Sequence, residues 1–245
     1  MNTSTAQSRI ALVFGGSRGI GAGIALRLAQ EGADVALTYA AAAAKANEVV
    51  ATIEQKGRAA LAIQADSGDA ADLQSAVRQA VERFGRIDIV VVAAGILHIA
   101  DVAEFSIDNL DRMLDVNVRG VYLAIKAALP HMGEGGRIVT IGSNAAERTS
   151  HPGSSVYSMT KGAVAVMVKG LAVDLAPRGI TINNIQPGPI ATDMTADMLE
   201  MITPLIPVKR VGQPAEIGGL VSYLTGPDSG YMTGASLTID GGMSL

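Results

Sequence analysis

The sequence predicts an α/β fold in which helices cover both faces of one doubly wound, seven-stranded parallel sheet. Short β-branched runs alternate with longer Ala-rich segments along the whole chain, and a glycine-rich turn follows the first run. No Pro/Ser-rich linker interrupts the alternation, and no repeat with a period of roughly 20–50 residues is present. We therefore expect residues 1–245 to form a single domain.

The first half of the chain contains four of the predicted strands. The fourth run is apolar after Asp88, as is typical of a central parallel strand that is buried on both faces. Apolar side chains recur at helical spacing between Ala70 and Phe84, and Gly32 separates the first helix from the second strand. In order we expect a strand at 9–14, a helix ending near 31, a strand at 34–39, a helix at 43–56, a strand at 59–65, a helix at 70–84 and a strand at 88–93.

The second half continues the pattern with three more strands. Pro130 should close a long helix that begins near Ile107, and Pro177 with Gly179 should end the next one. We expect a helix at 107–129, a strand at 137–142, a helix at 155–176, a strand at 180–186, a helix at 214–225 and a strand at 236–240. Only the Met- and Pro-containing stretch 192–208 is irregular, and it is a candidate mobile substrate lid beyond a strand end.

Composition excludes several classes of function. Hydrophobic residues make up 49% and charged residues 17%, against about 25% charged in a typical globular chain, so we expect a large core and contacts with other subunits. The net charge of −4 argues against binding to nucleic acid. The absence of Cys excludes disulfides, thiolate nucleophiles and Cys–zinc sites. Neither a leader of signal-peptide type nor an uncharged run of about 18 apolar residues is evident, so we expect a cytoplasmic protein without a membrane span.

The turn after the first strand is a candidate phosphate-binding loop. It reads Gly15-Gly16-Ser17-Arg18-Gly19-Ile20-Gly21 and leads directly into a helix. Glycines let the backbone approach a pyrophosphate, and the start of a helix offers free N–H groups and a positive dipole end. The spacing differs from the commoner G-x-G-x-x-G dinucleotide motif.

The second strand favours NADP(H) over NAD(H). It ends in Thr38-Tyr39-Ala40, without the acidic residue that usually binds the ribose 2′-hydroxyl of NAD. Arg18 could bind a 2′-phosphate instead, although it could also be a solvated loop residue. Five alanines at 40–44 follow the strand, so no basic residue stands immediately after it.

Tyr157 and Lys161 form a candidate proton-transfer pair. They are four residues apart on a predicted helix and therefore project from one face, although such a pair can also be a surface feature. The phenol of a free Tyr has a pKa near 10, and a neighbouring ammonium would lower it toward neutrality. Ser143 stands at the end of the fifth strand, where its hydroxyl could bind a substrate carbonyl. Asn117 lies within the long helix, where a polar side chain usually faces solvent.

Together these motifs resemble the short-chain dehydrogenase/reductase family in order and spacing, from Arg9 to Gly242. The resemblance implies a Rossmann-type fold and hydride transfer between a nicotinamide and a carbonyl or alcohol carbon. It assigns catalysis to Asn117, which would hold a water, and to Ser143, Tyr157 and Lys161, with Lys161 also on the nicotinamide ribose. Asp66 would bind adenine, although it could be an ordinary turn residue. The cofactor-binding residues expected on this basis are Gly15, Ser17, Arg18, Gly19, Ile20, Gly21, Tyr39, Asp66, Ser67, Ala94, Gly95, Tyr157, Lys161, Pro187, Gly188, Ile190 and Thr192.

Two positions depart from the family pattern. Phe14 stands where Thr is usual, and Ala93 stands where Asn is usual, so contacts of the loop and of the fourth strand are expected to differ. The resemblance needs no metal, and His98, His131 and His151 are scattered in the sequence. It also implies a homotetramer.

The absence of two arginines narrows the class of substrate that we expect. The 3-oxoacyl-carrier-protein reductases of the family dock an acidic carrier with arginines, but this chain has Val173 at one such place and Glu134 near the other. We therefore expect a small free ketone, or its alcohol in the reverse direction, rather than a carrier-bound acyl chain. An alternative on the same fold is a nucleotide-binding regulator of the cyclic-di-GMP type, which the segments 186–190 and 209–214 also resemble.

Overall fold

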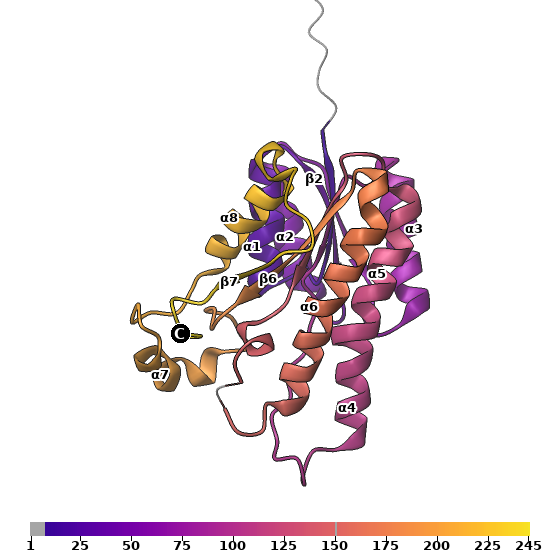
Figure 1. The fold of residues 1–245 in the computed structure, drawn as a ribbon. Helices are drawn as coiled ribbons and strands as arrows, with labels where there is room; N and C mark the ends of the chain where they lie inside the picture. The colour runs from indigo at the N-terminus through magenta and orange to yellow at the C-terminus, as the bar shows by residue number, and fades with distance from the viewer. Residues whose placement is uncertain (1–7, 150) are drawn as a thin grey trace, which may run out of the picture.

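A computed structural model describes residues 8–149 and 151–245 of the chain. All strands lie in one parallel sheet with the order β3-β2-β1-β4-β5-β6-β7, which confirms the predicted fold class (Figure 1). The strands are β1 (Ile10–Phe14), β2 (Asp34–Tyr39), β3 (Ala60–Gln64), β4 (Ile89–Val92), β5 (Arg137–Ile141), β6 (Thr181–Pro187) and β7 (Ser236–Ile239).

Helices form a layer on each face of the sheet (Figure 1). Apolar side chains of α1, α2 and α8 pack on one face, and those of α3, α5 and α6 pack on the other. The helices are α1 (Gly19–Gln30), α2 (Ala43–Gln55), α3 (Ala70–Phe84), α4 (Ile107–Leu114), α5 (Gly120–Ala128), α6 (Ser155–Leu175), α7 (Leu199–Ile202) and α8 (Pro214–Thr225).

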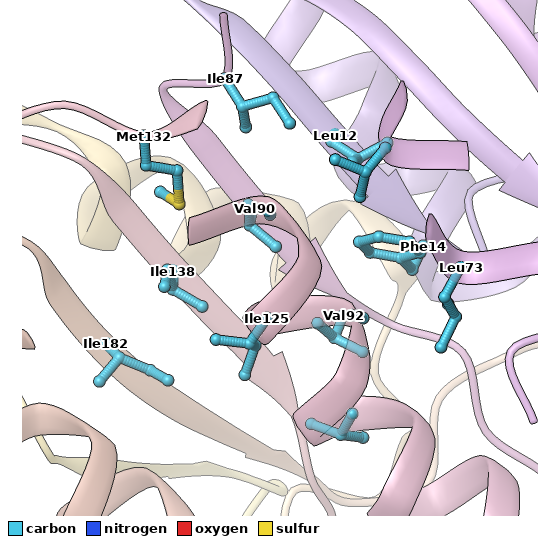
Figure 2. Packing of buried hydrophobic residues seen from close by; sticks show 14 of the residues in the cluster. Leu12, Phe14, Leu73, Ile87, Val90, Val92, Ile125, Met132, Ile138 and Ile182 are labelled. Carbon is cyan, nitrogen blue, oxygen red and sulfur yellow. The ribbon is translucent and has the colours of Figure 1, made fainter. Parts of the chain in front are cut away.

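The period of two along β1 explains how one strand serves both layers. Leu12 and Phe14 point into the core under α3, α5 and α6, whereas Ala11 and Val13 point into the core under α1, α2 and α8. Figure 2 shows the first of these cores, in which the Phe14 ring lies close to Leu73. A strand that is buried on both faces reads as a continuous apolar run, which is why the sequence predicts it well.

The long helix expected at 107–129 is present and contains one turn of π-helix. A π-helical turn, Asp115–Arg119, separates α4 from α5, and a short 3₁₀ turn follows α5. The predicted helix is therefore confirmed in extent, and the π-helical turn within it was not predicted. Such wide turns are found frequently at functional sites, and this one carries Asn117.

The stretch 192–208, expected to be irregular, contains short helical elements. It contains the short turns Ala196–Met198 and Thr203–Leu205 on either side of α7. Its proposed role as a lid is taken up below.

Among residues 8–149 and 151–245, one helix is long and apolar enough to cross a membrane by length and composition alone. It comprises residues Ser155–Arg178, which are α6 and the turn after it. One side of α6 packs into the core through Val164 and Val168, and a core helix passes the same test. The absence of a membrane span therefore stays a prediction.

Candidate functional site

The candidate site lies where the sheet reverses its winding. From β1 the chain proceeds outward to β2 and β3, and from β4 it proceeds outward in the other direction. Connections leaving the carboxyl ends of β1 and β4 therefore diverge and open a crevice, the usual ligand position in such sheets. The glycine loop 15–21 leaves β1 at this point and continues into α1.

Only glycine fits two positions of this loop. Gly15 has φ = +77°, and a Cβ there would lie 2.7 Å from the backbone nitrogen of Ala94. A Cβ at Gly21 would lie 2.1 Å from the carbonyl oxygen of Gly15. The loop and the first turn of α1 are thus packed backbone against backbone, which leaves the start of the helix open to a phosphate.

The Phe14 departure is compensated within the fold. Phe14 is fully buried in the core, so it offers the loop no hydroxyl. Instead, the Gly15 N–H donates to Oγ1 of Thr38 on the neighbouring strand at 3.0 Å, and the Gly16 N–H donates to the Thr38 carbonyl at 3.0 Å. The loop therefore takes its hydrogen bonds from β2.

A cavity of about 250 Å³ runs along the loop and the ends of β2, β3 and β4. Its size and its open helix start fit a nucleotide. Among the residues predicted to bind cofactor, the structure places these in its wall: Gly15, Ser17, Arg18, Gly19, Ile20, Gly21, Tyr39, Asp66, Ser67, Ala94, Gly95 and Thr192. Sequence reasoning missed Thr38, Ile96, Arg112, Val116, Asp193 and Met194, which line it too.

Two predicted nucleotide contacts are occupied by ion pairs. Both carboxylate oxygens of Asp66 accept from Nη2 of Arg112, at 2.7 and 2.9 Å, and this contact lowers the pKa of Asp66. Arg18 is exposed, and its Nη1 lies 3.3 Å from Oδ2 of Asp193. Neither partner is near in sequence, so no local signal would have identified these pairs.

A second cavity, of about 190 Å³, adjoins the first through the shared residues Ile20, Thr192 and Met194. Ser143 and Tyr157 lie in its wall, together with the predicted residues Pro187, Gly188, Ile190 and Thr192. Sequence reasoning did not name the rest of the lining, which is mostly apolar: Leu97, Ile99, Asn144, Ala145, Arg148, Met198, Ile202 and Met243 among others. His151 also lines this cavity.

Tyr157 and Lys161 lie on one face of α6, as predicted. Nζ of Lys161 lies 5.6 Å from the centre of the Tyr157 ring and donates to the Ile141 carbonyl at 3.1 Å. The Ser143 side chain lies in the same cavity wall as Tyr157, and its Oγ accepts from the Ala145 N–H at 3.1 Å. The two hydroxyls and the ammonium group are thus gathered at the carboxyl end of β5.

Burial sets the proton affinities of this pair. It lowers the pKa of Lys161 to about 8, because the charged ammonium group loses its hydration. Burial also raises the pKa of Tyr157, and the neighbouring Ser143 hydroxyl offsets this only in part. The direction for Tyr157 is opposite to the lowering expected from the sequence, since desolvation outweighs the neighbouring groups. A raised pKa keeps the phenol protonated at neutral pH.

Asn117 is buried, so the expectation that a mid-helix polar residue faces solvent does not hold for it. Its Oδ1 accepts from the Ile96 N–H and its Nδ2 donates to the Ile96 carbonyl, both at 2.9 Å. A Cβ at Gly95 would lie 3.4 Å from both Asn117 Oδ1 and Lys161 Nζ. The π-helical turn therefore brings Asn117 close to Lys161 and fixes the chain after β4.

Fold and site together define a nucleotide-binding α/β protein with Ser143, Tyr157 and Lys161 gathered beside an apolar pocket. The family described as Enoyl-(Acyl carrier protein) reductase matches residues 15–244. The chain belongs to the short-chain dehydrogenase/reductase family, whose members are oxidoreductases.

Three relatives illustrate the range of the family. A short-chain dehydrogenase/reductase from Serratia marcescens BCRC 10948 is 52% identical with a TM-score of 0.95, and the match covers 98% of this chain and 99% of that one. A short-chain dehydrogenase from Burkholderia cenocepacia J2315, solved in complex with NADP, is 45% identical over the same shares with a TM-score of 0.95. The cyclic-di-GMP-binding biofilm dispersal mediator protein of Escherichia coli K12 is 42% identical over 233 residues, which is 94% of each chain.

Proposed function

We propose that this protein is an NADP(H)-dependent reductase that converts a small free ketone to a secondary alcohol, or catalyses the reverse reaction. The hydroxyls of Ser143 and Tyr157 carry the proposal, because both line an apolar cavity that adjoins the nucleotide cavity. The complex of the Burkholderia cenocepacia relative with NADP supports the choice of cofactor.

The glycine loop would hold the cofactor pyrophosphate, and Arg18 would contact its 2′-phosphate. Asp66 and Tyr39, in the wall of the first cavity, would face the adenine, and Ile190 and Thr192, in the wall of the second, would face the nicotinamide. When bound, the nicotinamide supplies the hydride that the carbonyl carbon accepts.

Side chains in and beside the second cavity would transfer the proton to the substrate oxygen. Ser143 donates a hydrogen bond to the substrate carbonyl, and Tyr157 donates the proton that converts the oxygen to a hydroxyl. Its raised pKa keeps Tyr157 in the neutral form that reduction requires. Lys161 then stabilises the phenolate left behind, and Asn117 positions the backbone around Ile96 and holds a water that returns the proton.

The surface and the cavity favour a free ketone. The cavity wall is mostly apolar and its volume of about 190 Å³ suits a small molecule. Val173 is exposed on α6, and the exposed Glu134 would repel an acidic carrier protein. This makes a 3-oxoacyl-carrier-protein substrate the weaker alternative.

Assembly, location and lid complete the proposal. Exposed apolar side chains on α5 and α6, including Tyr122 and Val166, would be covered in a homotetramer. We further propose a cytoplasmic location, no nucleic-acid or membrane partner, and a substrate lid over residues 192–208 within a single domain.

The deciding experiment follows NADPH and NADH oxidation with a panel of β-keto esters, cyclic ketones, diketones and aldehydes. We expect turnover with NADPH that Tyr157→Phe reduces by at least about 100-fold while NADPH still binds, since the variant removes only the acid. Comparable turnover by the variant would refute the assigned mechanism. No turnover by the wild type, together with tight binding of cyclic-di-GMP, would favour the regulatory alternative that the Escherichia coli relative suggests.

A further inference from the structure

Three charged side chains from distant parts of the chain meet at the mouth of the nucleotide cavity. Arg18 precedes α1, Lys45 lies in the first turn of α2, and Asp193 follows β6. Oδ2 of Asp193 accepts from Lys45 Nζ at 2.7 Å, and Arg18 Nη1 lies 3.3 Å from the same oxygen. Each side chain is at least half exposed, so the cluster is open to solvent and to a ligand.

A single carboxylate oxygen, Oδ2 of Asp193, thus pairs with both Arg18 and Lys45. The contacts with Lys45 and Arg18 lower the pKa of Asp193, so the group is ionised at neutral pH. Two neighbouring cations of this kind can also bind the oxygens of a phosphate monoester. Arg18 and Asp193 line the cavity next to Tyr39 and Ala40, at the end of β2 where the adenosine ribose binds in folds of this type.

We propose that Asp193 is a built-in competitor for the 2′-phosphate of the cofactor, and that Lys45 joins Arg18 in binding this phosphate once Asp193 has left. The inference rests on the proposed use of NADP(H). A dianionic phosphate and the carboxylate cannot share the same two cations, because like charges at this separation repel each other. Asp193 therefore weakens NADP(H) binding and leaves NAD(H) binding unaffected.

Displacement of Asp193 would also reach the substrate cavity. Its neighbours Thr192 and Met194 line both cavities. Oγ1 of Thr195 accepts from the Thr192 N–H at 3.2 Å and so ties the turn together. Release of Asp193 would free this turn as a unit, so the 2′-phosphate would loosen the start of the 192–208 stretch.

The binding test compares two probes that differ only in the 2′-phosphate: adenosine 2′,5′-bisphosphate and adenosine 5′-monophosphate. By calorimetry we expect Asp193→Asn to bind the bisphosphate about fivefold or more tightly than the wild type, with the monophosphate unchanged, because an exposed pair is of this modest strength. Lys45→Met in the Asp193→Asn background should then lose about tenfold for the bisphosphate alone. Added salt should shrink both effects.

Matched controls are available nearby: Asp197 lies in the turn after Asp193, and Lys56 directly follows α2. Asp197 and Lys56 are exposed and form no ion pair among residues 8–149 and 151–245, so Asp197→Asn and Lys56→Met should leave both affinities unchanged. An Asp193→Asn protein that binds the bisphosphate no better than the wild type would overturn the proposal. A gain shared equally by the monophosphate, or by Asp197→Asn, would overturn it too.

Hydrogen exchange tests the release of the turn. We expect the amides of residues 192–198 to exchange faster with the bisphosphate than with the monophosphate, and unchanged or slower exchange would refute that part. Neither probe carries a nicotinamide, so these results do not depend on turnover. Failure of the reductase assay would therefore be distinguishable from failure of this inference.

Discussion

The buried ammonium group of Lys161 should leave a measurable signature in the pH dependence of stability. Its pKa is about 8 in the folded protein against 10.5 when exposed. Above pH 8 the folded state releases this proton before the unfolded state does. The unfolded state then binds more protons, so the free energy of unfolding rises with pH between about 8 and 10.5. The full difference corresponds to about 3 kcal/mol, of which about 2 kcal/mol falls between about pH 7.5 and pH 9.5.

Lys161→Met removes this titration and should flatten the curve. The assay is urea unfolding followed by far-ultraviolet circular dichroism at fixed protein concentration, since the chain contains no Trp for fluorescence. The wild type should gain about 2 kcal/mol more than the variant over that window. Lys169→Met, an exposed lysine on the same helix, should follow the wild type. Parallel curves for wild type and Lys161→Met would refute the reasoning that burial lowers this pKa.

Three further substitutions test the site. Gly21→Ala should weaken NADPH binding by at least about tenfold, measured by calorimetry, because its Cβ would collide with the loop. Gly219→Ala on α8 has open space around the new Cβ, so it should be neutral or stabilising in a thermal melt. Asn117→Ala should lower the free energy of unfolding by about 2 kcal/mol or more, since it strands the backbone N–H and C=O of Ile96, and urea titration measures the loss. Arg18→Ala should raise the KM for NADPH about tenfold and that for NADH less than about twofold; equal changes would remove its role at the 2′-phosphate.

The fold was predictable because its signals are local and repeated. Central strands such as β1 and β4 are apolar throughout, and the glycine loop marks where the first strand ends. The π-helical turn at Asp115–Arg119 was not predictable from periodicity. It carries Asn117, whose hydrogen-bond partner Ile96 lies 21 residues away in sequence.

The motif residues of the site could be named from the sequence, but their partners could not. Tyr157 and Lys161 share a helix, so their spacing predicts that they face the same way. The direction of the Tyr157 pKa shift was predicted wrongly, because burial depends on the packing of the whole pocket rather than on the adjacent lysine. Lys45 was not predicted as a cofactor-binding residue, because five alanines separate it from the end of β2. The start of α2 at Ala43 brings it near the glycine loop, where it pairs with Asp193.

The wall that the two cavities share places the proposed substrate site directly beside the proposed cofactor site. Hydride transfer requires the reacting carbon of the substrate to contact the nicotinamide, so the two binding spaces must adjoin without merging. Ile20, Thr192 and Met194 provide that boundary: the first comes from the phosphate loop, and the other two come from the start of the 192–208 stretch. A substitution of Met194, which lines both cavities, should therefore alter cofactor and substrate affinity together. A substitution of a residue that lines only the second cavity, such as Met243→Ala, should alter the substrate KM alone.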